Sequence, residues 1–152
     1  MRKGYYFWLI ILSISMIKAY AAYTHLSNQG IEGHVYRISG NQMPSPGIKP
    51  AKPVGISTTL YIYELTNLNQ TVKQDHSPFY SSIQTKLIKH VESGKDGYFK
   101  VNLPAGRYSI FVKKDSLFFA NLFDGNNNIS PVTVIPNSIT KIDIRVDYDA
   151  SY

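Results

Sequence analysis

The chain has 152 residues and contains no cysteine. Disulfide bonds and a cysteine nucleophile are therefore excluded. The lipid-modified cysteine that anchors bacterial lipoproteins is excluded as well. A domain without disulfides must be stabilised by its hydrophobic core, and a chain of this length is long enough to form one.

The sequence also has no apolar run of the roughly 20 residues that a membrane-spanning helix needs. Its longest apolar run covers residues 5–17, follows the basic pair Arg2 and Lys3, and ends before Lys18. The small-x-small pattern of Ala19 and Ala21 comes next. This order predicts a signal peptide over residues 1–21 that is cleaved on export, leaving no stable membrane insertion. The alternatives are an uncleaved anchor and a buried helix.

Long runs of like charge are absent too. The formal net charge is +6, and without Arg2, Lys3 and Lys18 the chain would carry +3. The remaining lysines and arginines are scattered among acidic residues. Because nucleic-acid binding needs a basic patch or stripe, we expect no nucleic-acid partner. From the predicted signal peptide, we expect the protein to be located in the periplasm or outside the cell.

No helical periodicity is sustained after residue 22, whereas alternation of apolar and polar residues recurs between turn-forming clusters. The pattern predicts an all-β domain of seven or eight strands, a β-sandwich of immunoglobulin-like or transthyretin-like style. Residues 55–65 carry apolar side chains on both faces and predict a central, doubly covered strand. Two polar stretches predict long surface excursions. The expected strands are residues 30–38, 55–65, 83–92, 98–103, 107–112, 131–135 and 139–148, and the excursions are residues 40–53 and 66–82.

Residues 93–112 give the clearest local pattern. Asp96-Gly97 has the composition of a tight turn, and Phe99, Val101 and Leu103 alternate with polar residues. Pro104-Ala105-Gly106 then reverses the chain before a second alternating segment that begins near Tyr108. We expect a β-hairpin with one face in the core.

The sequence D-G-Y-F-K-V-N-L-P-A-G-R-Y at residues 96–108, with G-I-E-G-H-V at residues 30–35, resembles the carboxypeptidase regulatory-like domain. The resemblance implies a transthyretin-like sandwich that accompanies other functions without contributing catalytic residues. The whole chain resembles exported bacterial proteins built on this domain, and that likeness implies no particular activity. The expected organisation is a signal peptide (1–21), a flexible N-terminus (22–29), the sandwich (30–148) and a tail (149–152).

Nothing in the sequence predicts a catalytic site. The four histidines, His25, His34, His76 and His90, lack the spacing of a zinc site, and no serine lies in a Gly-x-Ser-x-Gly elbow. Hydroxyisourate hydrolases of the same fold end in Tyr-Arg-Gly-Ser, whereas residues 148–152 read Tyr-Asp-Ala-Ser-Tyr. A hydrolase would require the fold to bring His34 or His90 beside an acid in a pocket. We expect no enzyme, and no catalytic or cofactor-binding residue.

One loop has spacing typical of metal ligands. Asp124, Asn126 and Asn128 place oxygen donors at alternate positions, as calcium loops do. The sixth position is Ile129 instead of glycine, and the twelfth is Ile135 instead of an acid. An asparagine-rich turn explains the same residues, so we expect no bound metal and no cofactor.

Aromatic residues are the remaining candidates for a binding surface. A core explains most of them, but together they could form a sugar-stacking platform or a protein contact. The sequence therefore predicts a non-catalytic exported module that binds protein through strand edges or long loops. Glycan binding is the alternative and an unrecognised hydrolase is a third hypothesis; the partner and the oligomeric state stay open. The aromatic set is Tyr61, Tyr63, Phe79, Tyr80, Phe118, Phe119 and Phe123.

Overall fold

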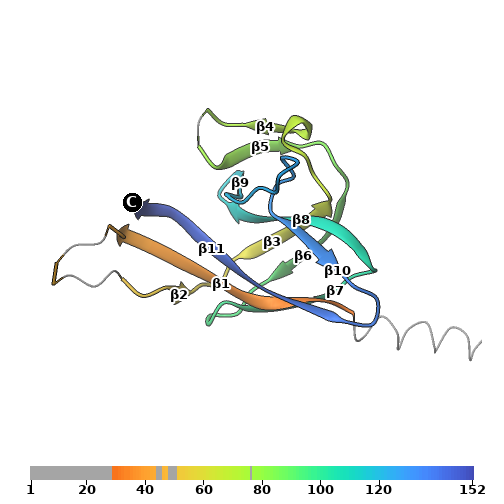
Figure 1. Cartoon of the computed structure of the whole chain (residues 1–152), viewed down its shortest axis with the longest axis horizontal. Helices are drawn as coiled ribbons and strands as arrows, with labels where there is room; N and C mark the ends of the chain where they lie inside the picture. Colours follow the sequence, from red (N-terminus) through yellow and green to blue (C-terminus); the bar gives the residue numbers. More distant parts are fainter. Residues whose placement is uncertain (1–28, 44–45, 48–50, 76) are drawn as a thin grey trace, which may run out of the picture.

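The computed structural model describes residues 29–43, 46–47, 51–75 and 77–152, which form two packed β-sheets (Figure 1). The predicted signal peptide, His25 and His76 lie outside the described residues. Gln29, the last residue of the predicted flexible N-terminus, is buried, and its side-chain amide donates to the Leu103 carbonyl at 3.0 Å. The folded body therefore begins at least one residue earlier than predicted.

The smaller sheet has four strands. Strand β1 (Gly30–Asn41) pairs in parallel with β11 (Ile139–Ser151), and these two long strands run side by side across the molecule in Figure 1. On its other side, β1 pairs antiparallel with β7 (Tyr98–Asn102) and with β2 (Val54–Gly55). Strand β11 thus forms one edge of this sheet.

The larger sheet has seven strands in the order β4-β5-β9-β8-β3-β6, with β10 pairing with β8. A short 3₁₀ turn, η1 (Leu68–Gln70), precedes β4. The prediction of an all-β sandwich is confirmed, although eleven strands are found among the described residues instead of seven or eight. The strand bounds in this sheet are β3 (Thr59–Glu64), β4 (Thr71–Lys73), β5 (Phe79–Ile83), β6 (Leu87–Glu92), β8 (Gly106–Lys114), β9 (Leu117–Phe119) and β10 (Pro131–Val134).

The main core lies between the two sheets, because alternate residues of each strand point inward. A second buried cluster covers the opposite face of the larger sheet. Strand β3 contributes to both: Leu60 and Ile62 belong to the main core and Tyr63 to the second cluster. The predicted double covering of this strand is confirmed. The second cluster consists of Tyr63, Tyr80, Phe111, Ala120 and Ile129.

The predicted hairpin over residues 93–112 is wrong in its pairing. Strand β7 pairs with β1 in the smaller sheet, whereas β8 pairs with β3, β9 and β10 in the larger one. Pro104-Ala105-Gly106 therefore carries the chain from one sheet to the other. The inward face was predicted correctly, since Phe99, Val101 and Leu103 are buried. The Tyr108 hydroxyl donates to the Pro104 carbonyl at 2.9 Å and fixes this crossing.

The predicted excursion over residues 66–82 is also wrong, because it contains η1, β4 and most of β5. These strands extend the larger sheet through pairing of β5 with β9. The predicted strand over residues 83–92 divides in two: Ile83 ends β5, and β6 begins at Leu87. Ile88 and Val91 pack against the core while Leu87 is exposed, with an irregular register opposite Ile62 and Tyr63.

Candidate functional site

A mostly apolar cleft lies between the two sheets beside the edge strand β11. Its volume is about 190 Å³, and the exposed residue Leu122 is part of its lining. The polar residues along its lining are Asn121, Ser130, Asp143 and Arg145. Such a cleft fits an apolar side chain flanked by groups that hydrogen-bond. Its apolar lining includes Ile110, Val112, Phe119, Val132, Ile142 and Ile144.

The cleft exists because β10 and β11 form no backbone pairing with each other. Within the described residues, one hydrogen bond joins the two strands: the Thr140 hydroxyl donates to the Thr133 carbonyl at 2.7 Å. Along β11, Val146 is fully buried, whereas the inward-facing Ile142 and Ile144 are only partly buried. Apolar surface on β11 is thus left incompletely covered.

Among the residues that the structure describes, no strand pairs with the outer edge of β11, which therefore carries free backbone groups. The Gly30 amide donates to the Ser138 carbonyl at 3.1 Å, and the parallel register continues from Gly30–Ile139 to Arg37–Val146. In a parallel pair, alternate residues direct both backbone groups to the neighbouring strand. The even-numbered residues 140–146 therefore face β1, and Lys141, Asp143 and Arg145 direct their amides and carbonyls to the free edge.

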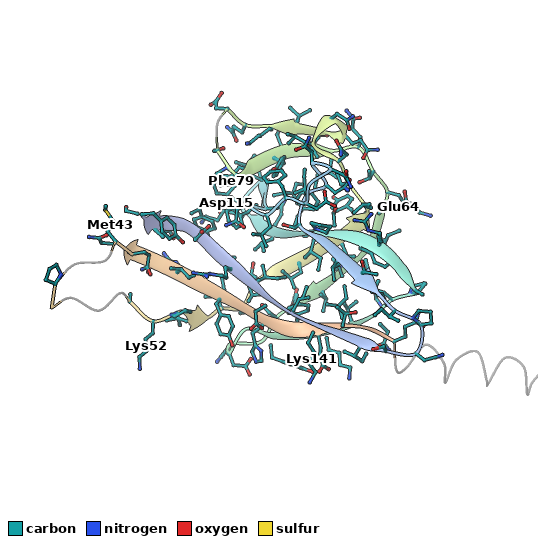
Figure 2. All side chains as sticks on the ribbon, in the orientation of Figure 1. Met43, Lys52, Glu64, Phe79, Asp115 and Lys141 are labelled. Atoms are coloured by element: carbon teal, nitrogen blue, oxygen red, sulfur yellow. The ribbon has the colours of Figure 1, made fainter. Side chains whose placement is uncertain are left out.

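Charges line the outer face of this edge. Glu32 on β1 lies 3.5 Å from the ammonium groups of both Lys141 and Lys100. Figure 2 shows Lys141 pointing away from the larger sheet, and 81% of its side chain is exposed. Asp143 accepts a hydrogen bond from the His34 amide at 3.2 Å. The outer face of β11 thus presents its charges to solvent beside the free backbone.

The neighbouring edge of β10 is better protected. Pro131 has no amide hydrogen, and the Thr133 carbonyl already accepts the Thr140 hydroxyl. Since Val132 and Val134 alternate with these residues in the β8 pairing, they direct their backbone groups toward β8. Of the two strands that border the cleft, β11 is the one open to strand addition.

His34 and His90 occupy different sheets. The Nδ1 atom of His34 lies 3.9 Å from an Asp143 carboxylate oxygen, with both side chains substantially exposed. Within the part of the chain that the structure describes, no serine or threonine hydroxyl is hydrogen-bonded to this imidazole. His90 lines an open groove of about 440 Å³ together with Lys89 and Lys100, and the described residues that line this groove include no acid. Among the residues that the structure places, neither histidine is part of a nucleophile–base–acid arrangement.

The Asp124 loop is held by hydrogen bonds within the protein. The Asp124 carboxylate accepts bonds from the backbone amides of Asn126 and Asn128, from the Asn128 side chain and from Arg107. The side-chain bond from Asn128, followed by the backbone bonds, lowers the pKa of Asp124 to about 2. Asn127 adopts a positive φ of 60°, as expected for an asparagine turn. No cluster of three or more metal-binding side chains occurs among the residues that the structure places.

Most of the predicted aromatic platform lies in the interior. Tyr63, Tyr80 and Phe119 are buried, and Phe79 packs against Phe119 and Tyr148. Of the rest, Tyr61 and Phe118 meet edge to face on the larger sheet, and the Lys113 ammonium covers Phe118 at 4.0 Å. Phe123 is exposed in the segment after β9, where its backbone bridges to Ile129. The seven aromatics do not form one flat surface.

A more open aromatic row, which the sequence reasoning missed, lies on the smaller sheet. His34 stacks on Tyr36 at 5.6 Å between ring centroids and meets Tyr98 edge to face at 5.5 Å. Tyr98 is 42% exposed. Period-two spacing of His34 and Tyr36 could have indicated a shared outer face. The approach of Tyr98 depends on β1–β7 pairing, which the predicted hairpin ruled out.

Comparison with known proteins gives no relative for this chain: no family model, no curated protein and no solved structure matches it. Within the described ranges, no helix is long and apolar enough to cross a membrane. The resemblance to the carboxypeptidase regulatory-like domain therefore stays a prediction from residues 30–35 and 96–108.

Proposed function

We propose that this chain is an exported, non-catalytic module that binds a protein partner at the β11 edge. One observation carries the proposal: a strand edge with outward backbone groups borders an apolar cleft. Export is supported by the predicted signal peptide over residues 1–21. The resemblance to the carboxypeptidase regulatory-like domain supports a role without catalysis, in the periplasm or outside the cell.

Binding would proceed by strand addition. An extended segment of the partner would pair with the outward amides and carbonyls of Lys141, Asp143 and Arg145. Its inward-facing side chains would cover Ile142 and Ile144 and enter the cleft. Backbone bonds would supply affinity that does not depend on sequence, and the cleft would select an apolar side chain.

The test places a photo-crosslinking residue at Arg145 in the full chain, expressed in cells that export it. We expect crosslinks to a protein partner from position 145 and none from Lys86, an exposed residue preceding β6 on the larger sheet. Adding Asp143→Pro should abolish the crosslink, because proline removes an outward amide that β1 does not use. Equal labelling from both positions, or an unchanged product in the proline variant, would contradict the proposal.

Glycan binding is the second candidate, favoured by the row of His34, Tyr36 and Tyr98. Aromatic faces on an open sheet can stack on sugar rings, and Glu32 and Asp143 lie nearby as hydrogen-bond acceptors. A glycan array with the wild-type protein and a Tyr98→Ala variant separates the two functions. Retention of a polysaccharide by the wild type and its loss in Tyr98→Ala would favour this candidate.

A further inference from the structure

The charges along the free edge of β11 are ordered so that the strand can pair with a second copy of itself, opposite charges facing each other. Residues 141–147 read Lys-Ile-Asp-Ile-Arg-Val-Asp. When this segment is placed antiparallel to a second copy with Ile144 opposite Ile144, Asp143 faces Arg145 of the other copy and Lys141 faces Asp147. Every charged residue of the segment then meets an opposite charge.

Backbone geometry admits the same register. Lys141, Asp143 and Arg145 direct their amides and carbonyls to the free edge, so residues of odd number must face residues of odd number. The register centred on Ile144 meets this condition. Moving it by two residues in one direction places Asp143 opposite Asp143 and Lys141 opposite Arg145. In the other direction, Arg145 faces Arg145 and Asp143 faces Asp147, and like charges directly opposite destabilise a strand pair.

The charges of the smaller sheet continue the pattern across this edge. Glu32 lies between Lys100 and Lys141, so a row runs positive, negative, positive from β7 through β1 to β11. Asp147 of a second copy would lie opposite Lys141 at the end of the paired segment. Asp147 already accepts bonds from Asn121 and the Tyr152 hydroxyl. The central Asp143–Arg145 pairs therefore set the register.

The inner face gains from the same pairing. Ile142 would lie opposite Val146 of the other copy, and Ile144 would lie opposite its own equivalent on the two-fold axis. Both isoleucines are only partly buried in one copy. A symmetric pair of edges also leaves neither copy with an open β11 edge, which closes the assembly at two copies.

We propose that the partner of the β11 edge is a second copy of this chain, giving a two-fold symmetric dimer with one continuous eight-stranded sheet. This inference rests on the proposed function, since it names the partner at that same edge. A strand pair of this length belongs to the small interfaces, so the dimer should dissociate on dilution.

Charge reversal tests the pairing in solution. In sedimentation equilibrium of the protein produced from the full chain, the wild type should dimerise. Asp143→Lys and Arg145→Glu should each weaken dimerisation at least about tenfold, because two like-charged pairs replace two opposite ones. An equimolar mixture of the two variants should form a one-to-one heterodimer, since the lysine introduced at position 143 of one copy then faces the glutamate introduced at position 145 of the other. Lys86→Glu and Glu92→Lys serve as matched controls and should dimerise as the wild type does.

A cysteine scan tests the register independently, because the chain has no cysteine of its own. Residues that face each other in a pair without hydrogen bonds have Cα atoms about 4.5 Å apart, within reach of a disulfide. Mild oxidation should link two copies of Ile144→Cys. It should leave Asp143→Cys and Arg145→Cys largely unlinked, since neither residue faces itself.

A wild type that stays monomeric, or single variants that fail to recover dimerisation when mixed, would overturn the dimer. Preferential linkage through residue 143 or 145 would overturn this register. Crosslinks from position 145 to a different protein, with a monomeric purified chain, would overturn the dimer while supporting the proposed function. If neither dimer nor crosslink forms, both proposals fail.

Discussion

The hydroxyl of Tyr80 is buried with no hydrogen-bond partner among the residues that the structure describes. The side chain is fully buried and meets Phe111 edge to face. Burial raises the pKa of this phenol, and the neutral hydroxyl still loses its bonds to water on folding. An unsatisfied buried polar group costs about 1–3 kcal/mol.

We therefore expect Tyr80→Phe to raise the free energy of unfolding by about 1 kcal/mol, because phenylalanine keeps the ring and removes the unpaired hydroxyl. Tyr108→Phe is the matched control. It should lower the free energy of unfolding by about 1 kcal/mol, since it removes the bond to the Pro104 carbonyl. Urea unfolding measures both changes. A loss of stability in Tyr80→Phe equal to that in Tyr108→Phe would contradict the assignment.

Asp124 gives the fold a dependence on acid pH. Its pKa is lowered in the folded state from 3.8 to about 2, first by the Asn128 side-chain bond. A lowered carboxyl pKa stabilises the fold fully above the unfolded value, and this contribution is lost as the pH falls toward 2. Asp124→Asn removes the titrating group. We expect the difference in melting temperature between wild type and variant to shrink between pH 5 and pH 2, and a constant difference would refute this role.

At the level of elements, the close approach of β1 and β11 depends on Gly33. A Cβ atom at this position would lie 1.5 Å from the Ile142 carbonyl oxygen, which belongs to the backbone of the neighbouring strand. No side-chain rotation can relieve that overlap. Gly33→Ala should therefore separate the two strands and lower the free energy of unfolding by about 3 kcal/mol or more.

Gly125→Ala is the control for this effect, because a Cβ atom there meets nothing within 4 Å. It should change the free energy of unfolding by less than about 0.5 kcal/mol. Chemical unfolding of both variants gives the comparison. Equal stability of Gly33→Ala and the wild type would show that β11 can move away from β1 without cost.

The strands β7 and β8 show that a sequence predicts which side chains face inward but not which strands pair. Period-two alternation identified which side chains of β7 and β8 face inward, because the core imposes that pattern on each strand separately. The pairing of strands depends on partners that are distant in sequence: β7 pairs with β1, and β8 pairs with β3. Neither alternation nor the Pro104–Gly106 turn distinguishes a hairpin from a crossing between sheets. The predicted hairpin therefore had correct strands and an incorrect partner.

On the scale of the whole molecule, this pairing decides which site exists. The alternating segment at residues 139–148 was predicted as a strand, with charges outside and isoleucines inside. The segment lies at a sheet edge because β1 is the one strand that it pairs with among the described residues. The cleft beside Ile142 and Ile144 follows from the same arrangement. The Asp124 turn was predictable because its hydrogen bonds are local, whereas the His34–Tyr98 contact requires two strands 64 positions apart in sequence.

The whole fold should open in two steps of unequal cost. The main core joins both sheets through β1, β3 and β8, whereas β5 places Tyr80 and Ile83 in the smaller cluster and Phe79 against the main core. Strand β4 contributes to neither cluster and pairs with β5. Local opening of residues 71–83 exposes less apolar surface than global unfolding does. We expect amide hydrogen exchange in this segment to be faster than in β3 and β8, because the free energy of its local opening is lower than that of global unfolding.

Tyr80→Ala should widen that difference, because it removes a large side chain from the smaller cluster and leaves the main core unchanged. Exchange in β3 and β8 should then stay slow while exchange in residues 71–83 accelerates at least about tenfold. Hydrogen exchange with mass spectrometry measures both segments in one protein. Equal acceleration in all strands would mean that the two clusters unfold together, and that the strands in the predicted excursion are as integral to the sandwich as β3.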